Sequence, residues 1–164
     1  MRSMLFVPGD RPERFAKALA SGADAVICDL EDAVTAVTRP QARLNVADLL
    51  RTTGRSMPLE RVLPAFTSNV ADLLRTTGRP IPLWVRINPV QTDDALPDLA
   101  AVVAARPDGI VLPKARSGAD LHRLDHWLEA LEVQHGLAYG SIKVLALITE
   151  TANAVLSGAS FTTP

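Results

Sequence analysis

Short apolar runs alternate with longer amphipathic stretches along this chain, and this alternation restricts it to few architectures. The apolar runs lie at residues 3–7, 25–28, 83–88, 109–114 and 143–148, and helical patterns lie between them at 10–19, 42–50, 94–105 and 120–135. Strand and helix in this order predict a parallel sheet with right-handed crossovers. Because the strands are almost continuously apolar, we expect both faces of the sheet to be covered.

Two local features of the predicted helices can be read from residue spacing. Asp10 is placed to cap the first helix, and Glu13 follows three residues later, as in a capping box. In the next helix, Leu44, Ala47 and Leu50 are expected to share one apolar face.

The predicted fold class is α/β, of the TIM (β/α)8-barrel type. The first strand is not followed by a Gly-rich dinucleotide fingerprint, and polar residues recur at the C-terminal end of every strand. A complete barrel takes about 250 residues, whereas this chain has 164. About five βα units are visible, so we expect one partial barrel domain over residues 1–164, truncated at its C-terminus.

An internal repeat interrupts this pattern. Residues 45–55 recur letter for letter at 69–79, at an offset of 24 residues. A solenoid needs at least three repeats, so the copy is better interpreted as a recent local duplication or as a sequence error. One copy suffices to link the second and third strands. We therefore expect the duplicated segment to form an outer insertion without a chemical role.

Composition excludes several classes of protein. The formal net charge of −1 provides no broad attraction to nucleic acid or to anionic membranes. No segment approaches the roughly 20 apolar residues that span a bilayer, and the first apolar run is too short for a signal peptide. The single cysteine, Cys28, fits a reducing compartment. A cytoplasmic protein without nucleic-acid or membrane partners is expected.

Arg86 and Glu150 are the first candidate site residues. Arg86 lies within an apolar strand, where a guanidinium is rarely buried without a partner. Its planar fork suits a substrate carboxylate, or an internal carboxylate such as Asp29 or Glu31 that it pairs for stability alone. Glu150 follows the last strand, where it is either an oxygen ligand for a hard cation such as Mg²⁺ or a glutamate in the first turn of a helix.

Other charged residues leave similar alternatives open. Asp29, Glu31 and Asp32 form an acidic cluster beside the second strand, and they repel one another unless Arg86, a metal ion or solvent offsets the charge. Arg11 and Lys17 flank the first helix, and they either hold a phosphate-bearing group or are simply solvated.

Lys114 ends the predicted fourth strand and suggests a Schiff-base aldolase. Its position near Arg116 shows no sign of the desolvation that such a lysine needs. We therefore rank this interpretation below a metal site.

Five motifs occur in a fixed order: RSMLFVPGDRPERF, SGADAVICDLEDAV, LWVRINP, GIVLPK and ALITET. In this order they resemble the citrate lyase β-subunit family, which belongs with the HpcH/HpaI-type aldolases and the malyl-CoA lyases. The resemblance covers the chain except for the duplicated stretch around residues 55–79.

The resemblance implies a TIM barrel that cleaves or forms a carbon–carbon bond in acyl-CoA thioesters of hydroxy di- or tricarboxylic acids, of the citryl-CoA or malyl-CoA type, with Mg²⁺. It assigns the substrate carboxylate to Arg86 and the metal ion to Glu150. Glu31 would lie near the metal and its waters, so Arg86 and Glu31 are the implied catalytic residues. The implied contacts with substrate or coenzyme A are Phe6, Arg11 and Lys17.

Members of the resembled family carry a second metal ligand, an aspartate after the sixth strand, and the present sequence ends before that position. We therefore expect the 164-residue chain to have little or no lyase activity alone. An alternative is a catalytically inactive remnant that acts as a CoA-binding or subunit-interaction module. A third interpretation is aldol cleavage of a free hydroxy-keto acid. The resemblance also implies a homo-oligomer, a trimer or hexamer, and leaves the acyl group open.

Overall fold

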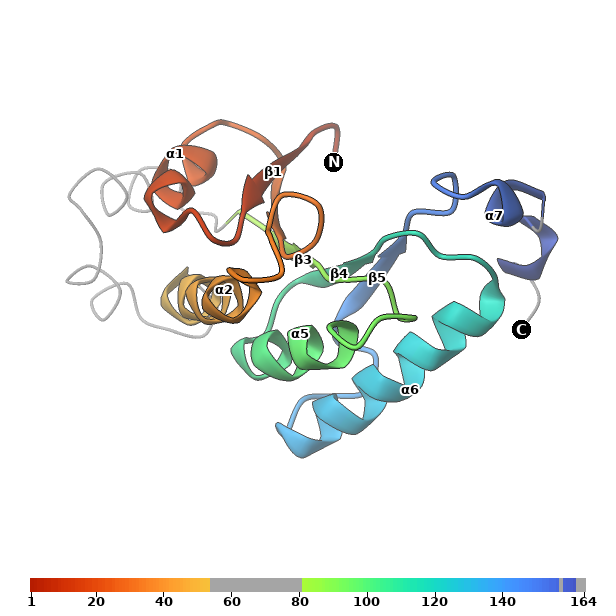
Figure 1. The fold of residues 1–164 in the computed structure, drawn as a ribbon. Coiled ribbons are helices and arrows are strands. Elements are labelled where there is room, and N and C mark those ends of the chain that lie inside the picture. The colour runs from red at the N-terminus through yellow and green to blue at the C-terminus, as the bar shows by residue number, and fades with distance from the viewer. Residues whose placement is uncertain (54–80, 157, 162–164) are drawn as a thin grey trace.

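Five parallel strands form the centre of the molecule. The computed structural model describes residues 1–53, 81–156 and 158–161. The strands are β1 (Met4–Pro8), β2 (Ala25–Asp29), β3 (Leu83–Arg86), β4 (Gly109–Leu112) and β5 (Lys143–Ala146). They form one sheet in the order β1-β2-β3-β4-β5 (Figure 1). This sequential order, without a reversal, is the order of a barrel rather than that of a doubly wound sheet.

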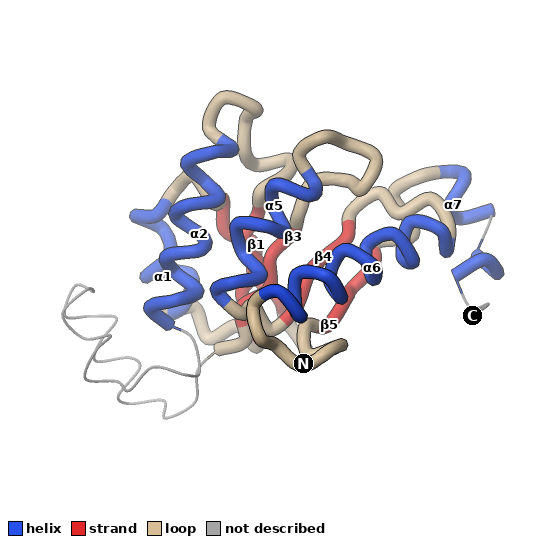
Figure 2. Tube along the Cα trace, turned by 90° about the horizontal axis from the view of Figure 1, so that it is seen from below, coloured by secondary structure: helices blue, strands red, loops and turns tan. Residues whose placement is uncertain are grey.

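Helices follow the strands at the predicted places. They are η1 (Pro12–Arg14), α1 (Phe15–Leu19), α2 (Arg39–Thr53), α5 (Ala95–Val102), η3 (Val103–Ala105), α6 (Gly118–Gln134), α7 (Ala152–Leu156) and η4 (Gly158–Phe161). Figure 2 shows the helices and strands along the Cα trace. No helix in the described part of the chain is long and apolar enough to cross a bilayer.

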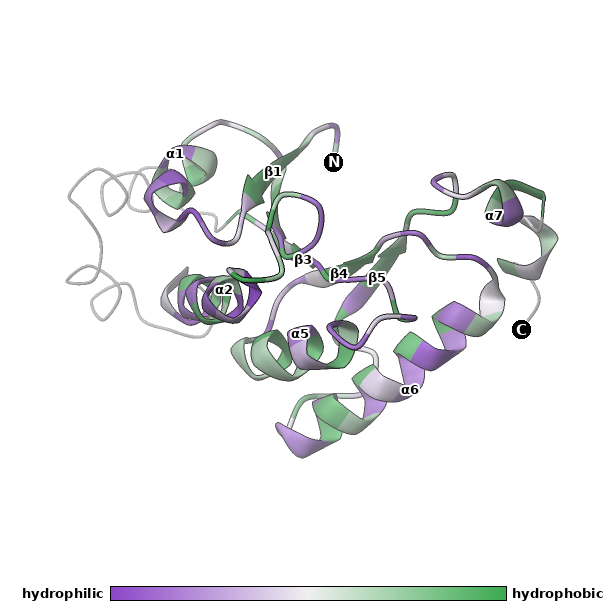
Figure 3. Cartoon of the chain, in the orientation of Figure 1, coloured by the Kyte–Doolittle hydropathy of each residue, from purple (hydrophilic) through white to green (hydrophobic). Residues whose placement is uncertain are grey.

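The three longest helices of the described residues, α2, α5 and α6, lie on one side of the sheet (Figure 1). The larger apolar core fills the space between them and the strands, and it includes Val26, Val85 and Leu112. Figure 3 shows largely hydrophobic strands beside helices of mixed character. Among the described residues, the opposite face has no such helical layer, so the expectation of cover on both faces is not met there.

The second face of the sheet carries a small core of its own, made by Ala25, Ile27, Trp84 and Val111. Trp84 and Gly109 are cross-strand neighbours. A Cβ on Gly109 would lie 2.3 Å from Cζ3 of the Trp84 ring, so the glycine makes room for the indole. The tryptophan is thereby buried against β4.

The sheet ends at β1 and β5 among the described residues, and the barrel is not closed. Both outer strands expose apolar side chains, notably Phe6 on β1 and Val144 on β5. An open barrel with two free edges agrees with the prediction of an incomplete barrel.

Two local predictions are wrong. Arg11, not Asp10, occupies the N-cap position of the first helical turn, and no side chain caps that turn. Asp10 instead accepts a hydrogen bond from Thr38 Oγ1 at 3.0 Å, so it ties two loops together. On α2 the predicted residues Ala47 and Leu50 are buried, but Leu44 is exposed, and Val46 packs in the core in its place.

The first copy of the repeat lies partly in α2, which runs to Thr53. The second copy, at 69–79, falls outside the described residues. Its role as an outer insertion and the single-domain organisation therefore stay predictions.

Candidate active site

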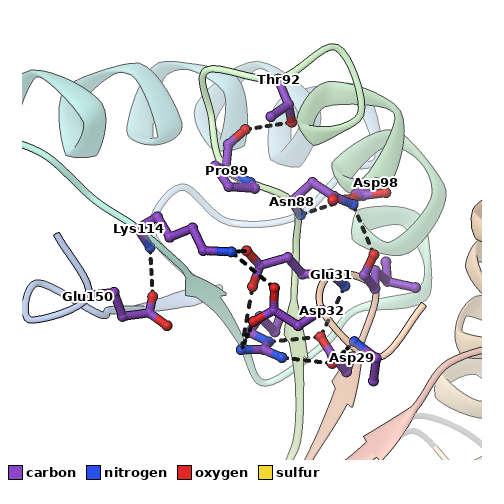
Figure 4. Close-up of polar contacts among 12 residues, drawn as sticks. Asp29, Glu31, Asp32, Asn88, Pro89, Thr92, Asp98, Lys114 and Glu150 are labelled. Atoms are coloured by element: carbon purple, nitrogen blue, oxygen red, sulfur yellow. Dashed lines mark hydrogen bonds and ion pairs between the residues drawn. The ribbon is translucent and has the colours of Figure 1, made fainter. Parts of the chain in front are cut away.

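Charged residues from neighbouring strands meet at the C-terminal edge of the sheet. Asp29 ends β2, Arg86 ends β3, Lys114 follows β4, and Glu150 follows β5 (Figure 4). Parallel strands bring their carboxyl ends to the same edge, which is where barrel enzymes place their active sites. The predicted candidates from separate motifs are thus collected in one region.

Arg86 is held by Asp29 through a two-point contact. Nε of Arg86 donates to Oδ1 of Asp29 at 2.8 Å, and Nη2 donates to Oδ2 at 2.7 Å. Backbone N–H groups of Glu31 and Ala33 also donate to this carboxylate, each at 3.0 Å. Burial alone raises the pKa of Asp29, but these hydrogen bonds, foremost those from Arg86, hold the pKa below its usual value. Pairing with an internal carboxylate, one of the two interpretations from the sequence, therefore accounts for this side of the guanidinium.

The remaining nitrogen of Arg86 takes part in a closed ring of ion pairs with Glu31, Lys114 and Asp32, called here the ion-pair ring. Nη1 of Arg86 lies 3.4 Å from Oε2 of Glu31 and 3.4 Å from Oδ2 of Asp32. Nζ of Lys114 lies 2.5 Å from Oε1 of Glu31 and 3.0 Å from Oδ1 of Asp32. Each carboxylate thus bridges the two cations. The long contacts show that Nη1 is held more loosely than the fork on Asp29.

Glu31 is buried and Lys114 is partly exposed. Burial raises the pKa of Glu31, although Lys114 and Arg86 oppose this effect. Oε2 of Glu31 accepts no hydrogen bond from the described residues. The pKa of Lys114 is raised, first by its hydrogen bond to Glu31. A lysine held as an ammonium ion is a poor Schiff-base nucleophile, so the structure also disfavours that interpretation.

Glu150 reaches the site through the backbone of Lys114. Its exposed carboxylate accepts the N–H of Lys114 at 2.8 Å, as Figure 4 shows. Among the described residues, no group of three or more His, Cys, Asp or Glu side chains is arranged to hold a metal ion. Mg²⁺ usually takes one or two carboxylates and completes its shell with water and substrate oxygens. Glu150, with its exposed carboxylate, fits that pattern, and its assignment as metal ligand stays a prediction.

The three predicted substrate or CoA contacts lie in different places. Phe6 reaches the site, because its ring centroid lies 4.8 Å from Cζ of Arg86. Arg11 lies near Asp10, with 3.9 Å between Nε and Oδ1. Lys17 is exposed on α1. No contact joins Arg11 or Lys17 to the ion-pair ring within the described residues.

Asp98 and Asn88 form a buried support that the sequence patterns did not indicate. Asp98 accepts the backbone N–H of Asn88 at 2.7 Å and its side-chain amide at 2.8 Å. The same amide donates to the carbonyl of Leu30 at 2.9 Å, and Arg43 Nε donates to Asp98 at 2.7 Å. This network joins the loops that follow β2 and β3. The signal available in the sequence was an aspartate at a core position of α5.

Known proteins resemble this chain in sequence and in structure. The family model described as HpcH/HpaI aldolase/citrate lyase matches residues 2–62 and 67–159. Citrate lyase subunit beta of Haemophilus influenzae is 33% identical over 147 residues, covering 90% of this chain and 43% of that protein. The L-malyl-CoA/beta-methylmalyl-CoA lyase of Cereibacter sphaeroides is 33% identical over 139 residues, covering 82% and 36%. The chain therefore spans less than half the length of these relatives.

A solved structure supports the same relationship. CitE of Mycobacterium tuberculosis, in complex with magnesium, acetoacetate and coenzyme A, matches with a TM-score of 0.61 and 32% identity, over 96% of this chain and 43% of that chain. Together with the sequential strand order, this similarity confirms the predicted α/β fold of the TIM-barrel type.

Proposed function

Because the chain belongs to the HpcH/HpaI aldolase/citrate lyase family, we propose that it provides part of the active site of a Mg²⁺-dependent carbon–carbon lyase. The proposed substrates are acyl-CoA thioesters of hydroxy di- or tricarboxylic acids, of the citryl-CoA or malyl-CoA type. The observation that carries this proposal is how Arg86 is held. Its Nε and Nη2 are fixed on Asp29, whereas Nη1 has two long contacts of 3.4 Å among the described residues.

In this proposal Arg86 binds the substrate carboxylate. A charge-assisted N–H···O bond is about 2.7–2.9 Å long, so an incoming carboxylate would make a shorter contact with Nη1 than Glu31 or Asp32 does. Asp29 keeps the guanidinium plane in place during this exchange. Phe6 lies over the guanidinium and adds a cation–π contact.

Glu150 would hold the metal ion, and Glu31 would face its water shell. Both offer the hard oxygen donors that Mg²⁺ prefers. When bound, the ion supplies Lewis-acid stabilisation of the negative charge that develops on oxygen as the carbon–carbon bond breaks. Magnesium in the related M. tuberculosis structure supports Mg²⁺ as the identity of the ion.

Arg11 and Lys17 would contact the coenzyme A part of the substrate. Both are exposed cations that follow β1 in the sequence, and Phe6 of β1 reaches Arg86. Coenzyme A in the related M. tuberculosis structure supports a thioester substrate. We further propose a cytoplasmic homo-oligomer, a trimer or hexamer, which sedimentation equilibrium would test.

The experiment incubates the protein with malyl-CoA or citryl-CoA and follows the thioester by chromatography, with Mg²⁺ and with EDTA. We expect binding of one thioester and slow cleavage that requires Mg²⁺ and stops in EDTA. Arg11→Met and Lys17→Met together should weaken thioester binding, whereas Arg51→Met on the outer helix α2 should not.

The outcomes separate the alternatives. Cleavage at the rate of an ordinary enzyme would contradict the expected impairment. Thioester binding without any cleavage would favour the inactive CoA-binding module. Absence of binding to both thioesters would contradict the proposed function. Cleavage of a free hydroxy-keto acid that is insensitive to the Arg11 and Lys17 changes would favour an aldolase that does not use CoA.

A further inference from the structure

Lys114 connects the two acidic parts of the candidate site. Its ammonium contacts Glu31 and Asp32, and its backbone N–H donates to Glu150. Figure 4 shows the side chain reaching from the end of β4 toward Glu31, while the backbone faces Glu150. Lys114 also has a φ of 50°, a left-handed conformation that residues with a Cβ rarely adopt. Backbone strain of this kind is concentrated at functional sites.

The charges of this region do not balance. Two cations face four carboxylates, which leaves a formal charge of −2, and the carboxylates are Asp29, Glu31, Asp32 and Glu150. Without the Lys114 ammonium the excess would be −3. The lysine is therefore a large part of the local electrostatic balance.

Glu31 has one buried carboxylate oxygen, Oε2, that faces Arg86 without a hydrogen bond from the described residues. The side chain of Glu31 is 4% exposed. Oε2 lies 3.4 Å from Nη1 of Arg86, as an ion pair. A buried carboxylate oxygen without a donor is costly, and such an oxygen is a suitable acceptor for a hard cation or for the water that the cation binds.

We propose that the Lys114 ammonium is a tethered cation that occupies the acidic part of the site and weakens the binding of a divalent cation there. This inference rests on the proposed Mg²⁺ dependence. A divalent ion on Glu150, with Glu31 facing its water shell, must share Glu31 with Nζ of Lys114. The divalent ion either displaces the ammonium or binds beside a positive charge. In both cases the affinity of the site for the ion is lower.

The exposure of Lys114 makes displacement feasible. Its side chain is 42% exposed, so the ammonium can move toward solvent on its flexible stem while the backbone keeps Glu150 in place. Lys114 thus sets the affinity for the ion and is not itself a ligand.

The test titrates Mn²⁺, as a probe for Mg²⁺, into the full protein by isothermal titration calorimetry. Lys114→Met removes the charge, and we expect Mn²⁺ to bind about tenfold tighter. Lys114→Gly also removes it and relieves the left-handed backbone, so it gives the same increase should the methionine variant fail to fold. Lys114→Arg keeps the charge and should bind like the wild type. Lys143→Met, at the opposite end of β5, is the matched control.

The possible results have distinct meanings. Tighter Mn²⁺ binding in the methionine or glycine variant, with no change in Lys143→Met, supports the inference. Unchanged or weaker binding in both variants, while the wild type binds Mn²⁺, overturns the inference and leaves the proposed function standing. An equal gain in Lys143→Met also overturns it. Failure of every protein to bind Mn²⁺ contradicts the metal dependence and the inference together.

Discussion

Arg86 and Asp29 form a buried two-point ion pair at the ends of adjacent strands. The two N–H···O distances are 2.8 and 2.7 Å, and the side chains are 11% and 2% exposed. Arg86 and Asp29 are also cross-strand neighbours in the sheet register. The pair therefore joins the stability of the sheet to the orientation of the residue proposed to bind substrate.

Asp29→Asn should destabilise the protein by about 3 kcal/mol, because it leaves the buried guanidinium with only the long contacts of 3.4 Å to Glu31 and Asp32 as charge partners. Urea denaturation at pH 7 measures the loss. Asp48→Asn is the control, since its ion pair with Arg51 is exposed and should contribute less than about 0.5 kcal/mol. Equal losses in the two variants would show that the buried pair has no special role.

Asp98→Ala should also cost about 3 kcal/mol, since it leaves donors of Arg43 and Asn88 unpaired in the interior. Asp93→Ala, on the exposed loop before α5, should change the free energy of unfolding by less than about 0.5 kcal/mol. Chemical denaturation of both variants measures the two changes in the free energy of unfolding. A loss below 1 kcal/mol for Asp98→Ala would contradict the supporting role of the network.

Asp94 gives a prediction for pH dependence. Hydrogen bonds and charge from Arg43 and Arg39 hold the pKa of Asp94 below its usual value. Its stabilising contribution is therefore fully present above the unfolded pKa of about 3.9 and is lost as the pH falls through the lower folded pKa. The stability difference between wild type and Asp94→Asn, at most about 1 kcal/mol for this partly exposed pair, should shrink below about pH 4. A difference that grows in acid would contradict this sign.

Gly109→Ala should destabilise the protein by about 2 kcal/mol, because the added methyl group overlaps the Trp84 ring. In the double variant with Trp84→Phe, the combined loss should be smaller than the sum of the single losses, since the smaller ring removes the overlap. Thermal unfolding of the four proteins measures this coupling. Strict additivity would show that the two residues do not interact.

Much of the fold was predictable from local sequence. The predicted run at 25–28 agrees with β2 (Ala25–Asp29), and the run at 109–114 contains β4 (Gly109–Leu112). Apolar runs bounded by Gly and Pro depend on neighbouring residues alone, so the strands that they predict are also present in the folded chain. The helix cap at Asp10 failed because its carboxylate has a partner in another loop, Thr38.

The residues of the site were predictable from the sequence, but their contacts were not. Motif order singled out Arg86 and Glu150, whereas the ion-pair ring joins Lys114 to Glu31 across 83 residues of sequence. Such pairings depend on tertiary proximity, which residue spacing does not encode. Asp98 was missed for the same reason, because an aspartate among apolar helix residues gives no indication of its partners.

The role of Arg86 is the central claim, and calorimetric binding of malyl-CoA or citryl-CoA at saturating Mg²⁺ tests it most directly. Arg86→Met should weaken binding of the accepted thioester about 30-fold or more, since a hydrogen bond between charged groups contributes about 2 kcal/mol. Arg86→Lys should recover part of the affinity, because it restores the charge without the fork. Binding by Arg86→Met within threefold of the wild type would contradict the account.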